Sequence, residues 1–284
     1  MGKRYSLRVQ IPTRRAIPIL ALVGAGAFLA ALAFRPLPLA NTQQAALVIQ
    51  ETGGMEASDS EEWWVNSGAQ VEKTESGFQT IQGELPWYSW WRIRYLLSNP
   101  VDTDNGEHPQ NILRFVNKSK WENGQQTMYV RVHRLNMSAS PERGAWSGIF
   151  FLHRYKDGDN LYYAGIRQDG AAVIKKKMNG VYYTMAYAPW YKEEAPYNRE
   201  INPNLIPGKQ WIGLRTLITS NEDGSVLIRL LLDEEGNGSW QTALEARDEG
   251  SQYGGDPIRG EGHGGMRSDF MDMEFRDYKV EPLS

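Results

Sequence analysis

The sequence predicts an all-β protein built as a two-sheet antiparallel sandwich, preceded by one N-terminal transmembrane or signal helix. Residues 150–187 alternate short β-branched and aromatic runs with DGDN, QDG and MNG. Asn-Gly and Asp-Gly supply the positive φ angles of tight hairpin turns, so this stretch reads as four successive antiparallel strands. Further strand-like runs recur at spacings of about 8–12 residues, with turn signals between them. Residues 47–283 are therefore expected to form one sandwich domain.

The N-terminal region predicts export. Residues 1–15 carry five Lys and Arg residues, and residues 16–34 carry no charge. One interpretation is an uncleaved single-pass anchor in the cell membrane, with the C-terminal domain outside the cytoplasm. The other is a signal peptide cut near Ala33 or Ala40, which would give a secreted protein. Residues 35–46 read as a linker in both.

The order of elements in the sandwich domain follows from alternation and turn residues. Residues 188–210 contain four prolines and predict a long loop. Residues 233–265 are rich in Gly and predict mostly loop, with 242–249 as either one turn of helix or a strand. Outside the 150–187 meander, the expected strands are 47–50, 64–70, 77–82, 88–98, 111–117, 125–135, 146–155, 211–220, 225–233 and 270–280.

Three stretches carry a family resemblance. RYKDGDNLYYAGIRQDGAAVIKKK, NPNLIPGKQWIGLR and GGMRSDFMDMEFRDYKV follow one another in this order. Together they resemble the concanavalin A-like lectin/glucanase superfamily, in its laminin-G-like and family-16-glycosidase-like members, over roughly residues 45–283. The resemblance implies a jelly-roll sandwich that binds saccharide on its concave face. Its motifs are typical of the fold and only weakly specific for an activity.

The expected function is that of an extracytoplasmic carbohydrate-binding, lectin-like domain with a polysaccharide or glycan as its partner. The alternative is a polysaccharide-degrading enzyme, a lyase or glycoside hydrolase of the same fold, so whether the chain is an enzyme stays open. The net charge of −3 gives no reason to expect nucleic acid. The membrane is expected as a partner through residues 16–34.

No cofactor is expected, and the one metal considered is a structural calcium ion. Cysteine is absent and the four His are scattered, so no zinc site is predicted. Carboxylates in loops and strand ends suit Ca²⁺, and Glu51 and Asp272 are the candidate ligands.

The final strand supplies the weak catalytic candidates. The resemblance to family-16 glycosidases, which carry Glu-x-Asp-x-Glu here, places Asp272 at the orienting position and Glu274 at the acid/base position. Two nearby carboxyl groups are what a retaining mechanism needs. Phe270 stands where the nucleophile should be, and Phe cannot attack an anomeric carbon. The alternative interpretation is a closing strand with solvated carboxylates.

The meander supplies the candidate saccharide site. Alternation puts His153 and Tyr155 on one face of a strand, and Lys175 and Lys177 on one face of another. Unpaired ammonium groups are costly to bury, so this lysine pair should avoid the inter-sheet layer. Together with Tyr163 they predict a polar and aromatic patch, which equally fits ordinary solvent-facing residues.

The loop after the meander supplies the expected rim of that patch. Trp190 and Tyr191 could stack on sugar rings, because both combine an apolar ring with a polar handle. Their alternative role is packing beneath the loop, next to the core.

Overall fold

The computed structural model describes residues 48–50, 53–67 and 70–283. The predicted segments 1–15 and 16–34, and the linker 35–46, lie outside these residues. Within the described part of the chain, no helix is both long and apolar enough to cross a bilayer.

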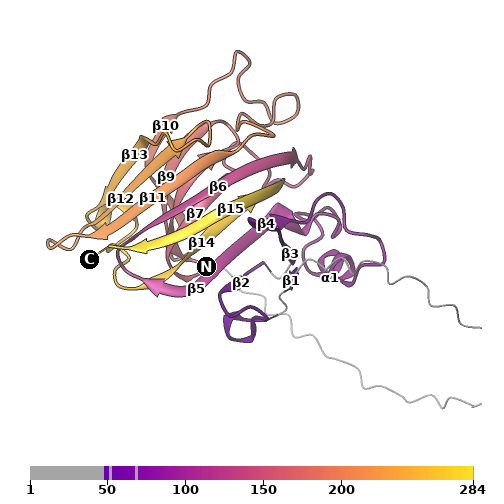
Figure 1. Cartoon of the computed structure of the whole chain (residues 1–284), viewed down its shortest axis with the longest axis horizontal. Helices are drawn as coiled ribbons and strands as arrows, with labels where there is room; N and C mark the ends of the chain where they lie inside the picture. The colour runs from indigo at the N-terminus through magenta and orange to yellow at the C-terminus, as the bar shows by residue number, and fades with distance from the viewer. Residues whose placement is uncertain (1–47, 51–52, 68–69, 284) are drawn as a thin grey trace, which may run out of the picture. The chain divides into compact units, whose positions relative to one another are not determined.

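The described residues form two antiparallel β-sheets, as the sequence predicts (Figure 1). The eight-stranded sheet has the order β1 (Val48–Gln50), β3 (Gln70–Lys73), β4 (Gly77–Thr80), β15 (Met271–Pro282), β6 (Gly124–Leu135), β11 (Ile212–Ser220), β12 (Val226–Asp233), β13 (Gln241–Asp248). The seven-stranded sheet has the order β10 (Val181–Pro189), β9 (Ala171–Met178), β8 (Asn160–Arg167), β7 (Gly148–Asp157), β14 (Gly262–Asp269), β5 (Ile112–Trp121), β2 (Trp63–Val65). Short 3₁₀ turns are η1 (Met55–Ala57), η2 (Pro109–Asn111) and η3 (Ser251–Tyr253).

The predicted four-strand meander is confirmed. Strands β7 to β10 are consecutive neighbours, each antiparallel to the next. The turn residues work as the sequence indicates: Gly170 and Gly180 have φ angles of 78° and 83°, and Asn179 has a φ of 51°. Only glycine adopts this region without steric cost, and Asn tolerates it better than most residues.

The core lies between the sheets and follows the two-residue period of the strands. Ile149 and Phe151 of β7 and Ile174 of β9 are fully buried there. Two pairs of polar side chains also lie in this layer. His153 Nε2 lies 2.6 Å from Thr216 Oγ1 of the facing sheet, and Lys176 Nζ lies 2.9 Å from a carboxylate oxygen of Asp248, with both side chains at 0% exposure. Buried polar groups persist only when paired, and these are.

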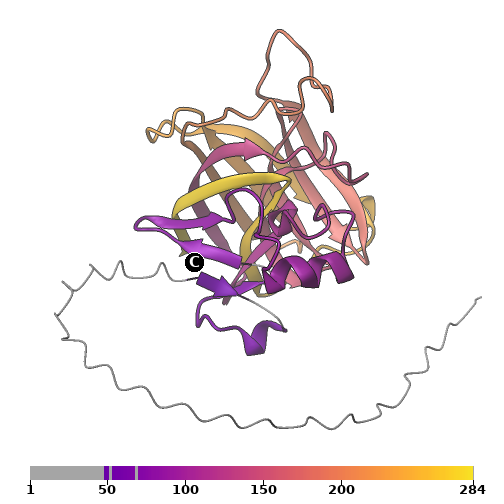
Figure 2. The same ribbon diagram turned by 90° about the vertical axis from the view of Figure 1, so that its right-hand side faces the viewer.

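One element differs in kind from its prediction. Residues 88–98, expected as a strand, contain the helix α1 (Trp90–Ser98), the only α-helix among the described residues (Figures 1 and 2). Trp91 and Tyr95 are its buried residues, four positions apart and therefore on one helical face. The helix ends before Pro100, which disfavours helical backbone at the residue preceding it. A run of aromatic and apolar residues is ambiguous between strand and helix, and here the four-residue period decides.

One further boundary differs. The expected strand 64–70 is divided, because β2 ends at Val65 and β3 begins at Gln70 in the other sheet. Of the two alternatives for residues 242–249, the structure bears out the strand, since β13 pairs with β12 along its length.

Candidate functional site

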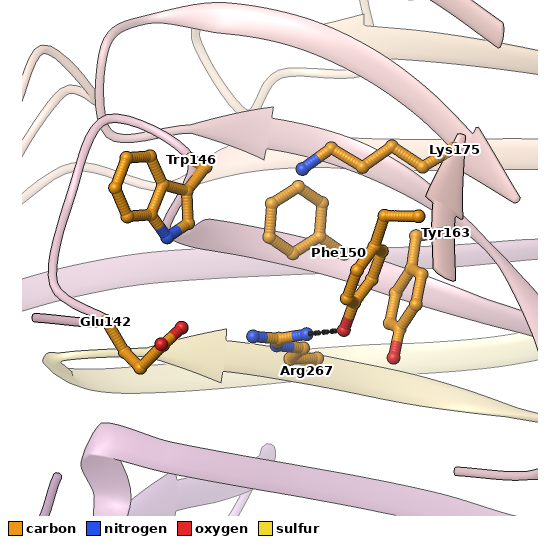
Figure 3. A pocket seen from close by; sticks show the side chains of 7 residues that line it. Glu142, Trp146, Phe150, Tyr163, Lys175 and Arg267 are labelled. Atoms are coloured by element: carbon orange, nitrogen blue, oxygen red, sulfur yellow. Dashed lines mark hydrogen bonds between the residues drawn. The ribbon is translucent and has the colours of Figure 1, made fainter. Parts of the chain in front are cut away.

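A pocket opens on the outer face of the seven-stranded sheet (Figure 3). Its volume is about 250 Å³. Figure 3 shows Glu142 and Trp146 on one side, and Tyr163 and Lys175 on the other. We call this the outer-face pocket, and its lining residues are Glu142, Trp146, Phe150, Tyr163, Lys175, Tyr182 and Arg267.

Strand register brings the pocket residues together. Tyr163 of β8 pairs with Lys175 of β9, and Phe150 of β7 pairs with Arg267 of β14. Side chains directly opposite one another on antiparallel strands share a face and lie close together. The Phe150 and Tyr163 rings meet edge to face, with centroids 6.2 Å apart. The pocket therefore has an aromatic floor with two cations set into it.

Lys175 is the most distinctive group in the pocket. Its ammonium lies 5.4 Å from the centre of the Phe150 ring. No hydrogen bond or ion pair to this ammonium exists within the described part of the chain. Burial, and then the positive charges of Arg167 and Arg267, lower the pKa of Lys175 to about 8. Lys175 is thus a mostly protonated, largely buried cation without a direct ion pair, although the carboxylates of Asp269 and Asp169 act on its charge.

Arg267 is the second cation. It pairs with Asp269 at 2.7 Å, lies 5.6 Å over the Tyr163 ring, and donates a hydrogen bond of 3.0 Å to the Tyr182 hydroxyl. Burial opposes its charge, but Asp269 and the two tyrosines outweigh burial and raise the pKa of Arg267. Burial raises the pKa of the Tyr182 phenol, but the charge and hydrogen bond of Arg267, together with Lys177 and Tyr163, outweigh burial and lower it.

Exposed aromatic rings border the pocket. The exposed fractions are 51% for Trp146 and 45% for Tyr182. Trp146 belongs to the β6–β7 loop, which is fixed by the buried Arg143, whose guanidinium donates to the carbonyls of Ser138 and Arg199. A ring held in place by such a loop can stack on a flat apolar surface without a large entropic cost.

A β-bulge separates His153 from Tyr155, so the prediction that they share a face is wrong. Pairing with β8 is interrupted after His153, and Arg154 has a φ of 46°. A bulge adds one residue and shifts the alternation. His153 lies in the inter-sheet core, whereas Tyr155 packs in the outer cluster with Phe150 and accepts a hydrogen bond of 2.7 Å from Asn66. Neither residue lines the outer-face pocket.

The other predicted residues fall in different places. Tyr163 and Lys175 line the pocket. Lys177 shares their face but is engaged by Asp159 at 3.0 Å and by the Gly158 carbonyl. Trp190 and Tyr191 are partly buried and pack against the inter-sheet core, which matches the alternative interpretation of these two rings.

Asp272 and Glu274 are held by structural partners on the eight-stranded sheet. The Asp272 carboxylate accepts hydrogen bonds from Gln110, Asn136 and the Gly83 amide and pairs with Arg134. Glu274 pairs with Arg131 at 2.5 Å. This donor set ties β15 to the segments beside it.

The calcium prediction receives no support at Asp272, because its four partners are donors, where Ca²⁺ would require oxygen ligands. Glu51 lies outside the described residues. Over residues 53–67 and 70–283, no group of three or more His, Asp or Glu is arranged to hold a metal ion.

Sequence reasoning missed five residues of the pocket: Glu142, Trp146, Phe150, Tyr182 and Arg267. Arg267 stands in the GGMRSD stretch, and Tyr182 is the second residue after the Asn179-Gly180 turn. Both positions could have been assigned to a face of the sheet by an argument from strand register. The position of the Trp146 ring at the pocket depends on the conformation of its loop, which no local sequence pattern encodes.

Comparisons with known proteins place the chain in no family. No protein-family model and no curated protein sequence matches it. Among solved structures, carbohydrate-binding module CBM66 from Bacillus subtilis has a TM-score of 0.46 and 12% identity, over 77% of this chain and 94% of that one. The GH43 protein BlXynB from Bacillus licheniformis has a TM-score of 0.36 and 14% identity, over 60% of this chain and 29% of that one. The alginate lyase from Klebsiella pneumoniae has a TM-score of 0.32 and 15% identity, over 57% of this chain and 60% of that one. Similarity at this level assigns neither a family nor a ligand.

Proposed function

We propose that this protein is an extracytoplasmic carbohydrate-binding protein of the concanavalin A-like superfamily, and that the outer-face pocket holds its ligand. The observation that carries the proposal is the pocket's aromatic floor, bordered by the exposed rings of Trp146 and Tyr182. Trp and Tyr present flat apolar faces with a polar edge, which suits the C–H faces of a sugar ring. The pocket is smaller than the roughly 300–1,000 Å³ of drug-sized clefts, so it suits one sugar residue or a chain end.

The charges of the pocket favour an acidic sugar. Arg267 is already paired with Asp269, but Lys175 is not paired. A largely buried ammonium without a direct ion pair gains more from a carboxylate or sulfate than an exposed ammonium does. The proposed ligand is therefore a glycan with a uronate or sulfated residue.

The binding proposal predicts that Trp146→Ala weakens binding of an acidic oligosaccharide by about 1–3 kcal/mol, because the stacking surface is lost. Isothermal titration calorimetry against ligands selected on a glycan array measures this. Tyr88→Ala is the matched control, since Tyr88 is 70% exposed, lies in the turn before α1 and is not among the residues that line the pocket. Equal affinities of all three proteins would show that the pocket plays no part.

Binding of an acidic glycan should also weaken as pH rises through about 8, because the pKa of Lys175 lies there and the neutral amine loses its attraction for the anion. The Lys175→Met protein should bind more weakly at pH 7 and lose this pH dependence. Neutral oligosaccharides serve as the control ligand, whose affinity should stay level. A pH profile unchanged by Lys175→Met would refute the role of this lysine.

A polysaccharide lyase is the second candidate, favoured by one observation. The Tyr182 phenol has a lowered pKa and accepts a hydrogen bond from Arg267. A uronate lyase needs a cation to neutralise the carboxylate and a base to remove the adjacent proton, and a tyrosine of lowered pKa can be that base. Absorbance of unsaturated uronate products on acidic polymers, abolished by Tyr182→Phe, would establish this activity in place of simple binding.

A further inference from the structure

The outward side of α1 and the residues that flank its ends carry several large, exposed apolar side chains. The exposed fractions are 78% for Trp87, 68% for Trp90 and 79% for Leu97, which is unusual for side chains of this size. We call this surface the α1 patch, and its residues are Trp87, Trp90, Ile93, Leu96, Leu97 and Val101.

The geometry of the helix separates the α1 patch from the core. Trp91 and Tyr95 face inward and are about 95% buried or more. At 100° per residue, Trp90, Ile93 and Leu97 lie within one narrow stripe on the opposite side. A helix that is apolar on two opposite sides buries only one of them against its own domain. The second side therefore calls for an apolar partner.

The anchor interpretation of residues 16–34, one of the two that the sequence leaves open, points to a bilayer as that partner. In that case the twelve residues 35–46 can reach at most about 40 Å when extended. The domain begins at β1, which pairs with β3, and the Tyr95 hydroxyl of α1 donates to the Ser67 carbonyl just before β3. Figure 1 shows α1 beside these two strands. A chain that stays anchored through 16–34 would tether the sandwich, and α1 with it, to the bilayer by this linker.

We propose that the α1 patch inserts into the interface of the phospholipid bilayer that holds residues 16–34, and so orients the sandwich on the membrane. Trp is enriched at that interface, and Leu and Ile enter the acyl boundary beneath it. The arginines of the helix are engaged within the protein: Arg92 pairs with Glu107, and Arg94 lies over the Trp91 ring. Insertion is driven by apolar burial and needs no anionic lipid. The proposal rests on the predicted anchor and is independent of the glycan site.

The absence of cysteine permits a direct test with a single nitroxide label. Leu97→Cys is labelled in the whole 284-residue chain, reconstituted in phosphatidylcholine vesicles, and its collisions with oxygen and with a water-soluble nickel chelate are compared. The label at 97 should favour oxygen, as a group in the acyl region does. The control is Ile201→Cys, 86% exposed in the β10–β11 loop, which should favour the nickel chelate.

A double substitution tests whether the label at position 97 is buried in the bilayer or by protein. Trp87→Ser with Trp90→Ser should return the label at 97 to water while the circular dichroism spectrum stays the same. Added phosphatidylglycerol should not change the depth. A label at 97 that stays in water refutes the proposal, whether or not the chain remains on the vesicles. Dipolar broadening between labels would show a second copy on the patch, and shielding from both reagents would show coverage by this chain; both outcomes refute it too.

Discussion

Replacing Asp248 by Leu is expected to lower the free energy of unfolding by about 3–5 kcal/mol, because it leaves a buried ammonium without its counterion. Lys176 and Asp248 are fully buried, and Asp248 also accepts a hydrogen bond of 2.6 Å from the Tyr162 hydroxyl. After the substitution, Lys176 keeps only the carbonyls of Gly255 and Asp256. Urea unfolding followed by tryptophan fluorescence measures the loss.

Two further variants test whether the buried pair is responsible. The double substitution Lys176→Met with Asp248→Leu should cost less than the sum of the single changes, because no charge is then left unpaired. Lys177→Met removes the neighbouring ion pair with Asp159, whose side chain is 65% exposed, and should cost about 1 kcal/mol or less. A loss for Asp248→Leu as small as that for Lys177→Met would contradict this account.

Acid is expected to destabilise the fold through His153. Burial, helped by the charge of Arg154, lowers the pKa of this imidazole from 6.5 to about 3. Above pH 6.5 the ring is neutral in both states, so its full contribution is present. Below 6.5 the unfolded chain gains a proton that the folded chain excludes, at about 1.4 kcal/mol per pH unit. The loss reaches on the order of 2–3 kcal/mol by pH 4.5.

The measurement compares wild type with His153→Gln by urea unfolding between pH 4.5 and 7.5. The free energy of unfolding of the variant should fall less steeply with decreasing pH than that of wild type, because Gln takes up no proton when the chain unfolds. His263→Gln is the control: burial and Lys120 also lower the pKa of His263, but its ring is only partly buried, so its effect on the slope should be smaller. Parallel curves for wild type and His153→Gln would rule out this explanation of acid sensitivity.

The sequence determined the parts of this protein that depend on local signals. Asn-Gly and Asp-Gly turns specify hairpins without distant contacts, which is why the meander was predictable strand by strand. Alternation along the strand puts Lys175 and Lys177 on one face, and the cost of burying unpaired charge predicts that this face lies outside the core. The structure places both lysines there. Three consecutive lysines on one strand also force one of them inward, and Lys176 occupies that position, paired with a residue 72 positions away in sequence.

Tertiary contacts decided the rest. The rings of Trp91 and Tyr95 favoured a helix over a strand by packing into the core. Trp146 reaches the outer-face pocket because Arg143 holds its loop against the chain near Arg199. The bulge that divides His153 from Tyr155 depends on Arg154, whose guanidinium donates to the Ile258 carbonyl and to Ser220, each at 2.8 Å. These partners are brought together only by the folded chain, so no pattern along the sequence carries the information.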